Sequence, residues 1–458
     1  KILGNKMIEK FINKLTTPTY PTNKPMFYPG YIKRTDGLDV DNTLIQLNAN
    51  YATNPDHIHG TFHRLASISD LEPTLYNHCT NNPTSIGNWL PPLIKAHRQT
   101  NNPALHIPTT RTVRLDHELA QYLRVEFSDT NKLSQHIFDA YLFNELKLDD
   151  TDYFIKTGTF SGKFQFANAP CAEPDEIGQY FHVINNFAMS VGAGETVDLA
   201  IRDYIPDTRE TTPTIYNGMP LRCEYRLFID FGDNPEAQNY TEPTRRAAYA
   251  HKFADPHETT DNCPTHIMGI THYWHRRVMR QHFAMLNNPE FAGYSGINPK
   301  DAHTYRAYEA ELDTQFNQHL NTVRAGVEEL LPGMYAQGFR GQWSMDVMVN
   351  ATETGEVVLY LIDMALMCES ALSDELDTVD ELRDVPVDDI RAAAGRKVLW
   401  YAPAPDFVPG SVVDGHGVAH EFVQGSAEKA LRWGVEKNLL STDGSSVPFL
   451  ETLPRSAD

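Results

Sequence analysis

Apolar residues recur along this chain with two different periods, so both strands and helices are expected. Short apolar or alternating runs predict strands at 153–156, 197–205, 221–231, 342–349 and 357–364. Spacings of three and four predict helices at about 174–192 and 302–331, and helical spacing also occurs between 113 and 148. The pattern therefore predicts a mixed α/β (α+β) fold.

The predicted strand 221–231 has two chemically different faces. Cys223 and Tyr225 begin an apolar face, whereas Arg222, Glu224 and Arg226 alternate with them on the opposite face. A solvated face would explain these charges without any function. A site that presents phosphate together with metal or ribose contacts would explain them as well.

Three regions are less regular than the rest. The segment 1–112 is rich in Pro, Asn, Thr and His, and we expect an N-terminal arm and a loop-rich, substrate-side domain there. The segment 232–300 reads as an irregular insertion. The segment 373–458 begins with an acidic run and predicts a C-terminal extension that wraps the core or reaches a partner.

Length, charge and cysteine usage limit the class of protein. A chain of 458 residues accommodates two or three domains. Its formal net charge of −21 argues against general nucleic-acid affinity. No apolar run approaches the roughly 20 residues of a membrane span. The five cysteines are scattered and include no C-x-x-C pair, which predicts neither disulfides nor zinc and favours a reducing cytoplasm. The segment 1–14 does not resemble a secretory signal, and the chain does not begin with methionine, as expected of a partial or processed chain.

The stretch 153–166 has the features of a phosphate-binding segment. A short apolar strand ends in Lys156, and a loop of small residues follows and is closed by Lys163. A fixed cation and a loop whose backbone N–H groups face the ligand together suit a triphosphate. Gly158 and Gly162 would permit the close approach of the backbone. An ordinary turn between two strands is the alternative interpretation.

The two late strands each carry one aspartate among apolar neighbours. These residues are Asp346 and Asp363. A carboxylate in such a setting is costly unless it is paired or bound to metal. On adjacent antiparallel strands the two aspartates would converge on one cation, and Mg²⁺ prefers a few carboxylates with water and phosphate. For either aspartate alone, capping a turn or pairing with an arginine is the simpler explanation.

The order of these features resembles the ATP-grasp superfamily of ATP-dependent ligases. The resemblance covers about 153–372 and depends on 154–163, 201–205, 224–226, Asp346 and 362–366. It implies two α/β subdomains that sandwich ATP. The implied division is a small subdomain at 113–205 and a large subdomain at 206–372 that contains the insertion 232–300.

The resemblance also implies roles for individual residues. Lys156 would contact the α- and β-phosphates, and Arg226 would neutralise the γ-phosphate during transfer. Asp346, Asp363 and Glu369 would hold one or two magnesium ions. The implied ATP-binding residues are Lys156, Gly158, Thr159, Ser161, Gly162, Lys163, Arg202, Asp203, Tyr204 and Glu224.

The implied activity is that of a ligase forming carbon–nitrogen bonds. Mg-ATP would convert a carboxylate into an acylphosphate, which an amine or similar nucleophile then attacks. The sequence does not identify the substrates, and it leaves the oligomeric state open, including a homodimer.

This chain departs from the family pattern at the last strand, and two other functions follow as alternatives. The family usually has a glutamate followed two residues later by an asparagine, whereas here Asp363 is followed by Ala365. A non-catalytic ATP-binding module is therefore one alternative. The basic and aromatic segment 273–280 supports the other, an ATP-dependent modifier of nucleic acid or protein.

Overall fold

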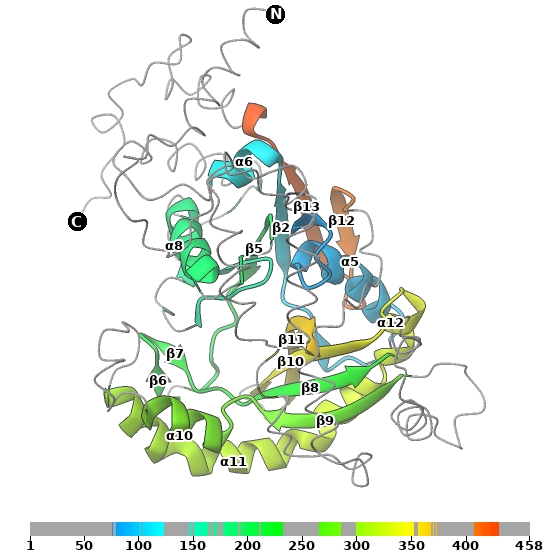
Figure 1. Cartoon of the computed structure of the whole chain (residues 1–458). Helices are drawn as coiled ribbons and strands as arrows, with labels where there is room; N and C mark the ends of the chain where they lie inside the picture. Colours follow the sequence, from blue (N-terminus) through cyan, green and yellow to red (C-terminus); the bar gives the residue numbers. More distant parts are fainter. Residues whose placement is uncertain are drawn as a thin grey trace, which may run out of the picture.

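We describe the fold from a computed structural model of the chain. The described residues are 76, 79–100, 102–122, 146, 148, 151–163, 166, 169–171, 177–190, 193–194, 196–209, 212–231, 265–284, 299–351, 356–367, 370, 372 and 407–429. Within them the fold is mixed α/β, as predicted, and two sheets lie one above the other in the view of Figure 1.

The lower sheet in this view, sheet A, carries the arginine strand and both aspartate strands. Its strands in spatial order are β1 (Leu105–His106), β11 (Val357–Leu366), β10 (Gln342–Ala351), β8 (Glu224–Asp230) and β9 (His266–His272). β1 pairs with β11 in parallel, and the other neighbours are antiparallel. The register places Asp346 opposite both Arg226 and Asp363, so the two aspartates converge as predicted.

The upper sheet, sheet B, carries the lysine strand. Its strands in spatial order are β12 (Gly410–Val413), β13 (Ala419–Gly425), β2 (Thr110–Leu115), β5 (Asp198–Asp203), β3 (Tyr153–Thr157) and β4 (Pro170–Cys171). β13 runs parallel to β2, although most of the chain lies between them in sequence. The predicted C-terminal extension thus supplies two strands of this sheet, and the predicted boundary at 112/113 falls inside β2. A separate two-stranded sheet pairs β6 (Thr214–Ile215) with β7 (Met219–Pro220).

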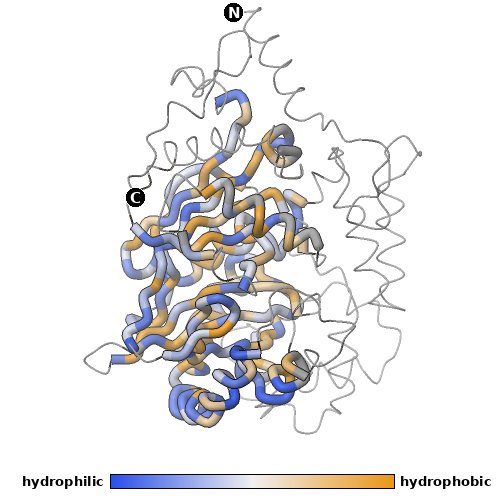
Figure 2. Tube along the Cα trace, turned by 90° about the vertical axis from the view of Figure 1, so that its left-hand side faces the viewer, coloured by the Kyte–Doolittle hydropathy of each residue, from blue (hydrophilic) through white to orange (hydrophobic). Residues whose placement is uncertain are grey.

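Helices cover the sheets. They are α5 (Ile86–His97), α6 (His117–Tyr122), α8 (Ile177–Ser190), α10 (Arg276–Ala284), α11 (Pro299–Glu328) and α12 (Leu331–Ala336). α8 and α11 correspond to the two long helices that the sequence predicts. α10 and α11 lie at the bottom of the molecule, where the tube in Figure 2 is mostly blue, and the strands above contain most of the orange.

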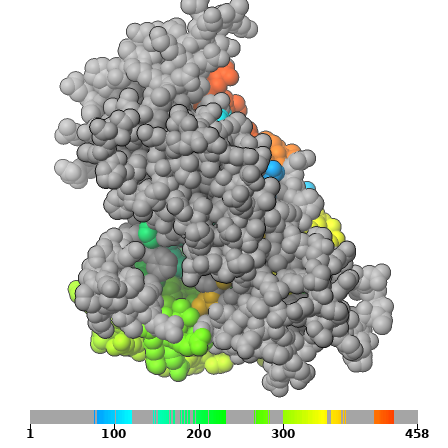
Figure 3. Space-filling model, in the orientation of Figure 1, coloured from blue at the N-terminus to red at the C-terminus, as the bar shows by residue number. Residues whose placement is uncertain are grey.

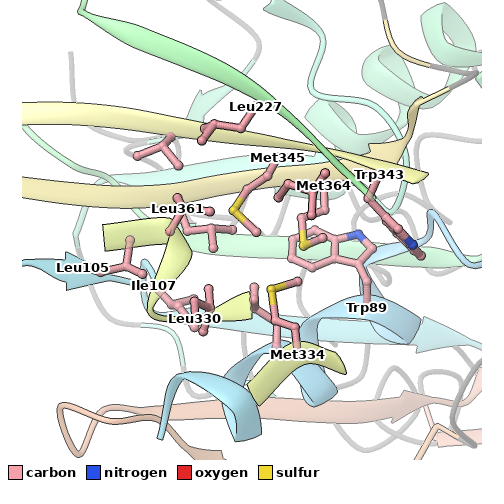
Figure 4. Close-up of a cluster of buried hydrophobic side chains, with 14 of the residues drawn as sticks. Trp89, Leu105, Ile107, Leu227, Leu330, Met334, Trp343, Met345, Leu361 and Met364 are labelled. Atoms are coloured by element: carbon pink, nitrogen blue, oxygen red, sulfur yellow. The ribbon is translucent and has the colours of Figure 1, made fainter. Parts of the chain in front are cut away.

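The main core lies between sheet A and the helices α5, α11 and α12. Figure 4 shows Trp89 of α5 close to Trp343, Met345 and Met364 of the sheet. Each of these four side chains is at most 3% exposed. The apolar face of β8 that the sequence predicts also enters this core.

Two elements of sheet A's core differ from the sequence interpretation. α5 forms within the region expected to be loop-rich, although it contains Pro91 and Pro92. An interior proline costs a helix about 3 kcal/mol, and burial of Trp89 and Leu93 offsets this cost. β9 lies within the segment interpreted as an irregular insertion, yet it is paired to β8 over its whole length.

Candidate functional site

A cavity between the two sheets collects most of the residues that the sequence singled out. β3 and β5 of sheet B contribute to its lining, and so do β8, β10 and β11 of sheet A. Of the predicted site residues, those that line it are Lys156, Ser161, Lys163, Arg202, Asp203, Tyr204, Glu224, Asp346 and Asp363. The chain thus brings these residues to one place from segments that are far apart in sequence.

An ion pair joins the two sheets across the cavity. Lys156 Nζ on β3 donates a hydrogen bond of 2.6 Å to Asp363 Oδ1 on β11. The Lys156 side chain is only 2% exposed. Burial lowers the pKa of Lys156, and Asp363 partly opposes this shift by stabilising the charged ammonium. The contact with Asp363 thus holds the Lys156 amino group at a fixed position on its strand.

A second pair lies one strand away. Arg226 binds Asp346 through two hydrogen bonds, Nε to Oδ1 and Nη2 to Oδ2, each 2.7 Å long. Burial by itself would lower the pKa of Arg226, but the two contacts with Asp346 outweigh it and raise that pKa. This fork geometry fixes the direction of the guanidinium group.

Arg202 on β5 has hydrogen-bonding capacity that the described residues do not use. The residue is 4% exposed, and Nη1 donates to the backbone oxygen of Ile362. Nε and Nη2 have no hydrogen-bond partner within the described part of the chain. Burial lowers the pKa of Arg202 to about 10, with Asp363 opposing. Buried N–H groups without partners are costly, so an acceptor from a ligand would be stabilised here.

Lys163 and Glu224 also line the cavity, and the charge of each residue influences the pKa of the other. Burial and, to a smaller extent, Arg226 lower the pKa of Lys163 to about 8. Burial and the carboxylate of Asp346 raise the pKa of Glu224 to about 8. Glu224 is therefore mostly protonated at neutral pH and adds little negative charge to the cavity.

Tyr273 is a lining residue that the sequence interpretation did not assign to this site. Its hydroxyl accepts a hydrogen bond of 2.5 Å from Lys163 Nζ, which also lies 4.4 Å from the ring centroid. Arg226 Cζ lies 5.1 Å from the same centroid. Tyr273 follows β9 directly, so it joins the glycine loop of sheet B to sheet A. The basic, aromatic segment around it was the only signal in the sequence.

The first residues of the glycine loop, Gly158 and Thr159, donate hydrogen bonds to other segments of the chain. The N–H of Gly158 donates to Asp198 O at 2.7 Å, and a Cβ there would lie 2.2 Å from Thr196 Oγ1. Thr159 Oγ1 donates to Ala193 O at 2.7 Å, and Gly162 has a φ of +61°. Glycine at 158 is thus required by the close approach of Thr196. Ser161 and Lys163 are the members of this predicted loop that line the cavity.

The predicted hinge residues lie at the other end of the cavity. Asp203 is paired with Arg111 at 2.9 Å, and its side chain is 49% exposed. Near Tyr204, Arg222 also lines the cavity. It is 5% exposed, and its Nε lies 3.7 Å from Asp207 Oδ2 and makes no hydrogen bond to the described residues. The sequence pattern placed Arg222 on the charged face of the strand, but Arg222 was not among the predicted site residues. Glu369 lies outside the described residues.

The cavity is positively charged in a protein whose net charge is −21. Lys156, Lys163, Arg202 and Arg222 line it, with Arg226 beside them. Asp346, Asp363 and, at Arg222, Asp207 oppose these cations, whereas Asp203 is paired with Arg111 and Glu224 is mostly protonated. Such a cavity suits a polyanionic ligand.

Two opposed carboxylates fit a magnesium ion that takes its other ligands from phosphate and water. Asp346 and Asp363 are register partners on adjacent strands. The described residues contain no group of three or more His, Cys, Asp or Glu side chains placed to hold a metal. A pair of carboxylates such as Asp346 and Asp363 suits an ion shared with a phosphate ligand.

The basic segment after Tyr273 begins a surface helix. In α10, Arg276 is paired with Asp313 and Arg280 with Glu309, both on α11. These two arginines are thus engaged by carboxylates of the same chain.

No family model and no curated protein sequence matches this chain. Among the described helices, none has the length and apolar character needed to cross a membrane.

Proposed function

We propose that the cavity between the sheets binds Mg-ATP and that the two sheets are the two halves of an ATP-grasp fold. The observation that supports this most strongly is the convergence of Lys156 and Arg202 from sheet B with Arg226, Asp346 and Asp363 from sheet A. A triphosphate would satisfy the partnerless N–H groups of Arg202. The apolar and aromatic side chains of the lining, Phe154, Tyr204, Ile205 and Met348, suit a flat base.

We further propose that the activity is ligation of a carboxylate to an amine. A carboxylate oxygen attacks the γ-phosphorus and the bond to the β–γ bridging oxygen breaks, which yields an acylphosphate and ADP. The amine then attacks the carbonyl carbon, loses a proton and expels phosphate, which leaves an amide. Magnesium held by Asp346 and Asp363 would neutralise charge on the phosphates.

The residues of the chain would act by position and charge. Lys156 and Arg202 would bind phosphate oxygens from the side of sheet B. Arg226, held in place by Asp346, would oppose the charge that develops on the transferred phosphoryl group. Asp363 would exchange its bond to Lys156 for the metal, which frees the ammonium group for phosphate.

Calorimetric titration with Mg-ATP tests the binding proposal. We expect K156M and D363N each to weaken binding by about 100-fold, since K156M removes a cation that would bind phosphate and D363N removes a carboxylate that would hold the magnesium. K95M, which removes an exposed lysine of α5, is the matched control and should bind like the wild type. Wild-type affinity in K156M and D363N would refute the proposed site.

ADP release in the presence of carboxylate and amine panels tests the ligase proposal. Release that requires both substrates would support it. Tight binding of Mg-ATP without release across the panels would instead favour the non-catalytic module, and the departure at Ala365 would then be its explanation.

A further inference from the structure

A second cluster of titratable groups lies at the opposite edge of sheet B, and it runs from buried side chains to the exposed His416. It consists of His97 at the end of α5, His106 of β1, and Asp414, His416 and His420 of the β12–β13 hairpin. His97 is 1% exposed, His420 is 0% exposed and Asp414 is 3% exposed. The orange hairpin reaches the surface next to blue residues of the chain in Figure 3. The proposed nucleotide site uses none of these groups.

The hydrogen bonds fix His97 in one neutral tautomer. The backbone N–H of Gly415 donates to His97 Nδ1 at 3.1 Å, so Nδ1 carries a lone pair. Nε2 must then carry the proton, which it donates to Leu105 O at 2.7 Å. A proton added at Nδ1 would oppose the Gly415 N–H and break this contact between hairpin and helix.

The same carbonyl links the hairpin to β1. His416 Nε2 also lies 2.8 Å from Leu105 O. The His416 ring is stacked on His106 with centroids 4.1 Å apart and planes 1° apart. Two protonated imidazoles at this separation would repel each other, so the stack requires that at least one of them be neutral.

Asp414 organises the turn of the hairpin. Its Oδ1 accepts the backbone N–H groups of His416 and Val418, at 2.8 and 3.0 Å. Its Oδ2 lies 3.2 Å from His420 Nε2 and 4.0 Å from His97 Nδ1. Gly415 is required at the contact, because a Cβ there would lie 2.7 Å from His97 O.

We propose that His97, His106, His416 and Asp414 form an acid-sensitive latch that holds the β12–β13 hairpin on the core at neutral pH and releases it on acidification. The facing titratable groups are Asp414 and His420 from the hairpin and Tyr360 of β11, whose ring centroid lies 5.7 Å from that of His106. Lys95 of α5 and Arg98, which follows the helix, lie in an open groove at the surface beside Ser411 and Val413.

The lowered pKa values of His97 and His106 also favour opening of the hairpin at acidic pH. Burial lowers the pKa of His97, with Leu105 O and Asp414 opposing, and burial and His416 lower the pKa of His106. An opened hairpin exposes both rings to water, and each then takes up a proton below its ordinary pKa of 6.5. Opening therefore becomes more favourable as the pH falls below about 6.5.

Release would affect the sheet that holds the nucleotide cavity. β13 pairs with β2, and β2 pairs with β5, which carries Arg202. Loss of the hairpin would leave β2 as an edge strand. The latch proposal depends only on the contacts of the hairpin, and it would hold even if the cavity did not bind Mg-ATP.

Hydrogen exchange of the full chain between pH 5 and 7.5, corrected for intrinsic rates, tests the latch. Below pH 6.5 we expect the opening constant of 410–425 to rise by up to about tenfold per pH unit for each histidine that gains a proton, and so by up to about 100-fold per pH unit for both. The amides of β10 serve as the internal reference and should not follow this slope. Equal opening of 410–425 at both ends of the pH range would overturn the proposal.

Two variants test whether His97 and His106 cause the pH dependence of hairpin opening. H97Q keeps a donor and an acceptor without a titratable ring, and H106F keeps the stacked ring without titration. Each should reduce the pH slope of 410–425 while the hairpin stays closed. H303Q, on the exposed side of α11, is the control and should keep the wild-type slope. An unchanged slope in H106F would overturn the proposal even if H97Q failed to fold.

Discussion

Two buried arginines of sheet B show how a structural charge differs from one suited to a ligand. Arg114 donates to Asp198 through Nε and Nη2 at 2.7 and 2.9 Å, and Nη2 also reaches Asn88 Oδ1 at 2.8 Å. Asp198 is 0% exposed and additionally accepts from Ser85 and Gly87. Arg202, on the neighbouring strand, is just as buried but has two nitrogens without partners among the described residues.

The difference follows from where each side chain points. The Arg114 network closes the joint between β2, β5 and the start of α5, and its groups satisfy one another. Arg202 lines a cavity, so its remaining donors can be satisfied only by something that enters it. Satisfaction of hydrogen bonds therefore separates the two roles better than burial or charge does.

The largest expected effect comes from the same substitution made at both arginines. R114M should destabilise the protein by about 3–5 kcal/mol, because it leaves the buried carboxylate of Asp198 without its cation. R202M should change the free energy of unfolding by less than about 1 kcal/mol, since it removes an incompletely satisfied charge. Urea denaturation of the two variants without nucleotide measures both values. Equal destabilisation would contradict the comparison.

For the affinity of Mg-ATP, in contrast to stability, R202M should have the larger effect and R114M the smaller. R202M should weaken Mg-ATP binding by about 10–100-fold, the loss expected for hydrogen bonds to a charged group. A stable folded fraction of R114M should bind with wild-type affinity, because Arg114 does not line the cavity. Calorimetry on both variants is the measurement. Unchanged binding in R202M would mean that its partnerless donors do not face the ligand.

The sequence predicted which residues lie together at the cavity better than it predicted the extent of the sheets. Alternation along 221–231 separates Glu224 and Arg226 from the apolar face, and this holds in the structure because burial selects one face of a strand. Asp346 and Asp363 converge because adjacent antiparallel strands place them in register. Both results depend on local pattern.

What the sequence could not predict depends on distant or opposing effects. α5 contains two prolines, so local rules favour a loop, and the burial of its apolar residues, Trp89 and Leu93 among them, explains the helix. β13 joins β2 from the far end of the chain, a pairing without any local signal. Tyr273 becomes a site residue through its contact with Lys163, 110 positions away.

A further effect, spread over several pH units, concerns the pH dependence of stability at Glu224. Its pKa is about 8 in the folded protein against an ordinary 4.5, so between these values the native state keeps a proton that the unfolded chain has lost. The free energy of unfolding therefore falls as the pH rises through this window, by up to about 1.4 kcal/mol per pH unit. The difference between the wild type and E224Q in urea denaturation at pH 5–8 should show this slope. A flat difference would exclude a raised pKa.

The smallest expected effect is that of Y273F. This variant tests whether the Tyr273 hydroxyl positions Lys163 in the cavity. The variant keeps the ring beside Lys163 and Arg226 and removes the hydroxyl that accepts from Lys163 Nζ. If this bond positions Lys163 for contact with phosphate, Mg-ATP affinity should fall by about 3–10-fold, or about 1 kcal/mol. Y273L should lose more, because the cation–π contacts are also removed. Tighter binding by Y273F would show instead that Tyr273 competes with the ligand, and Lys163 would then resemble Arg114 more than Arg202.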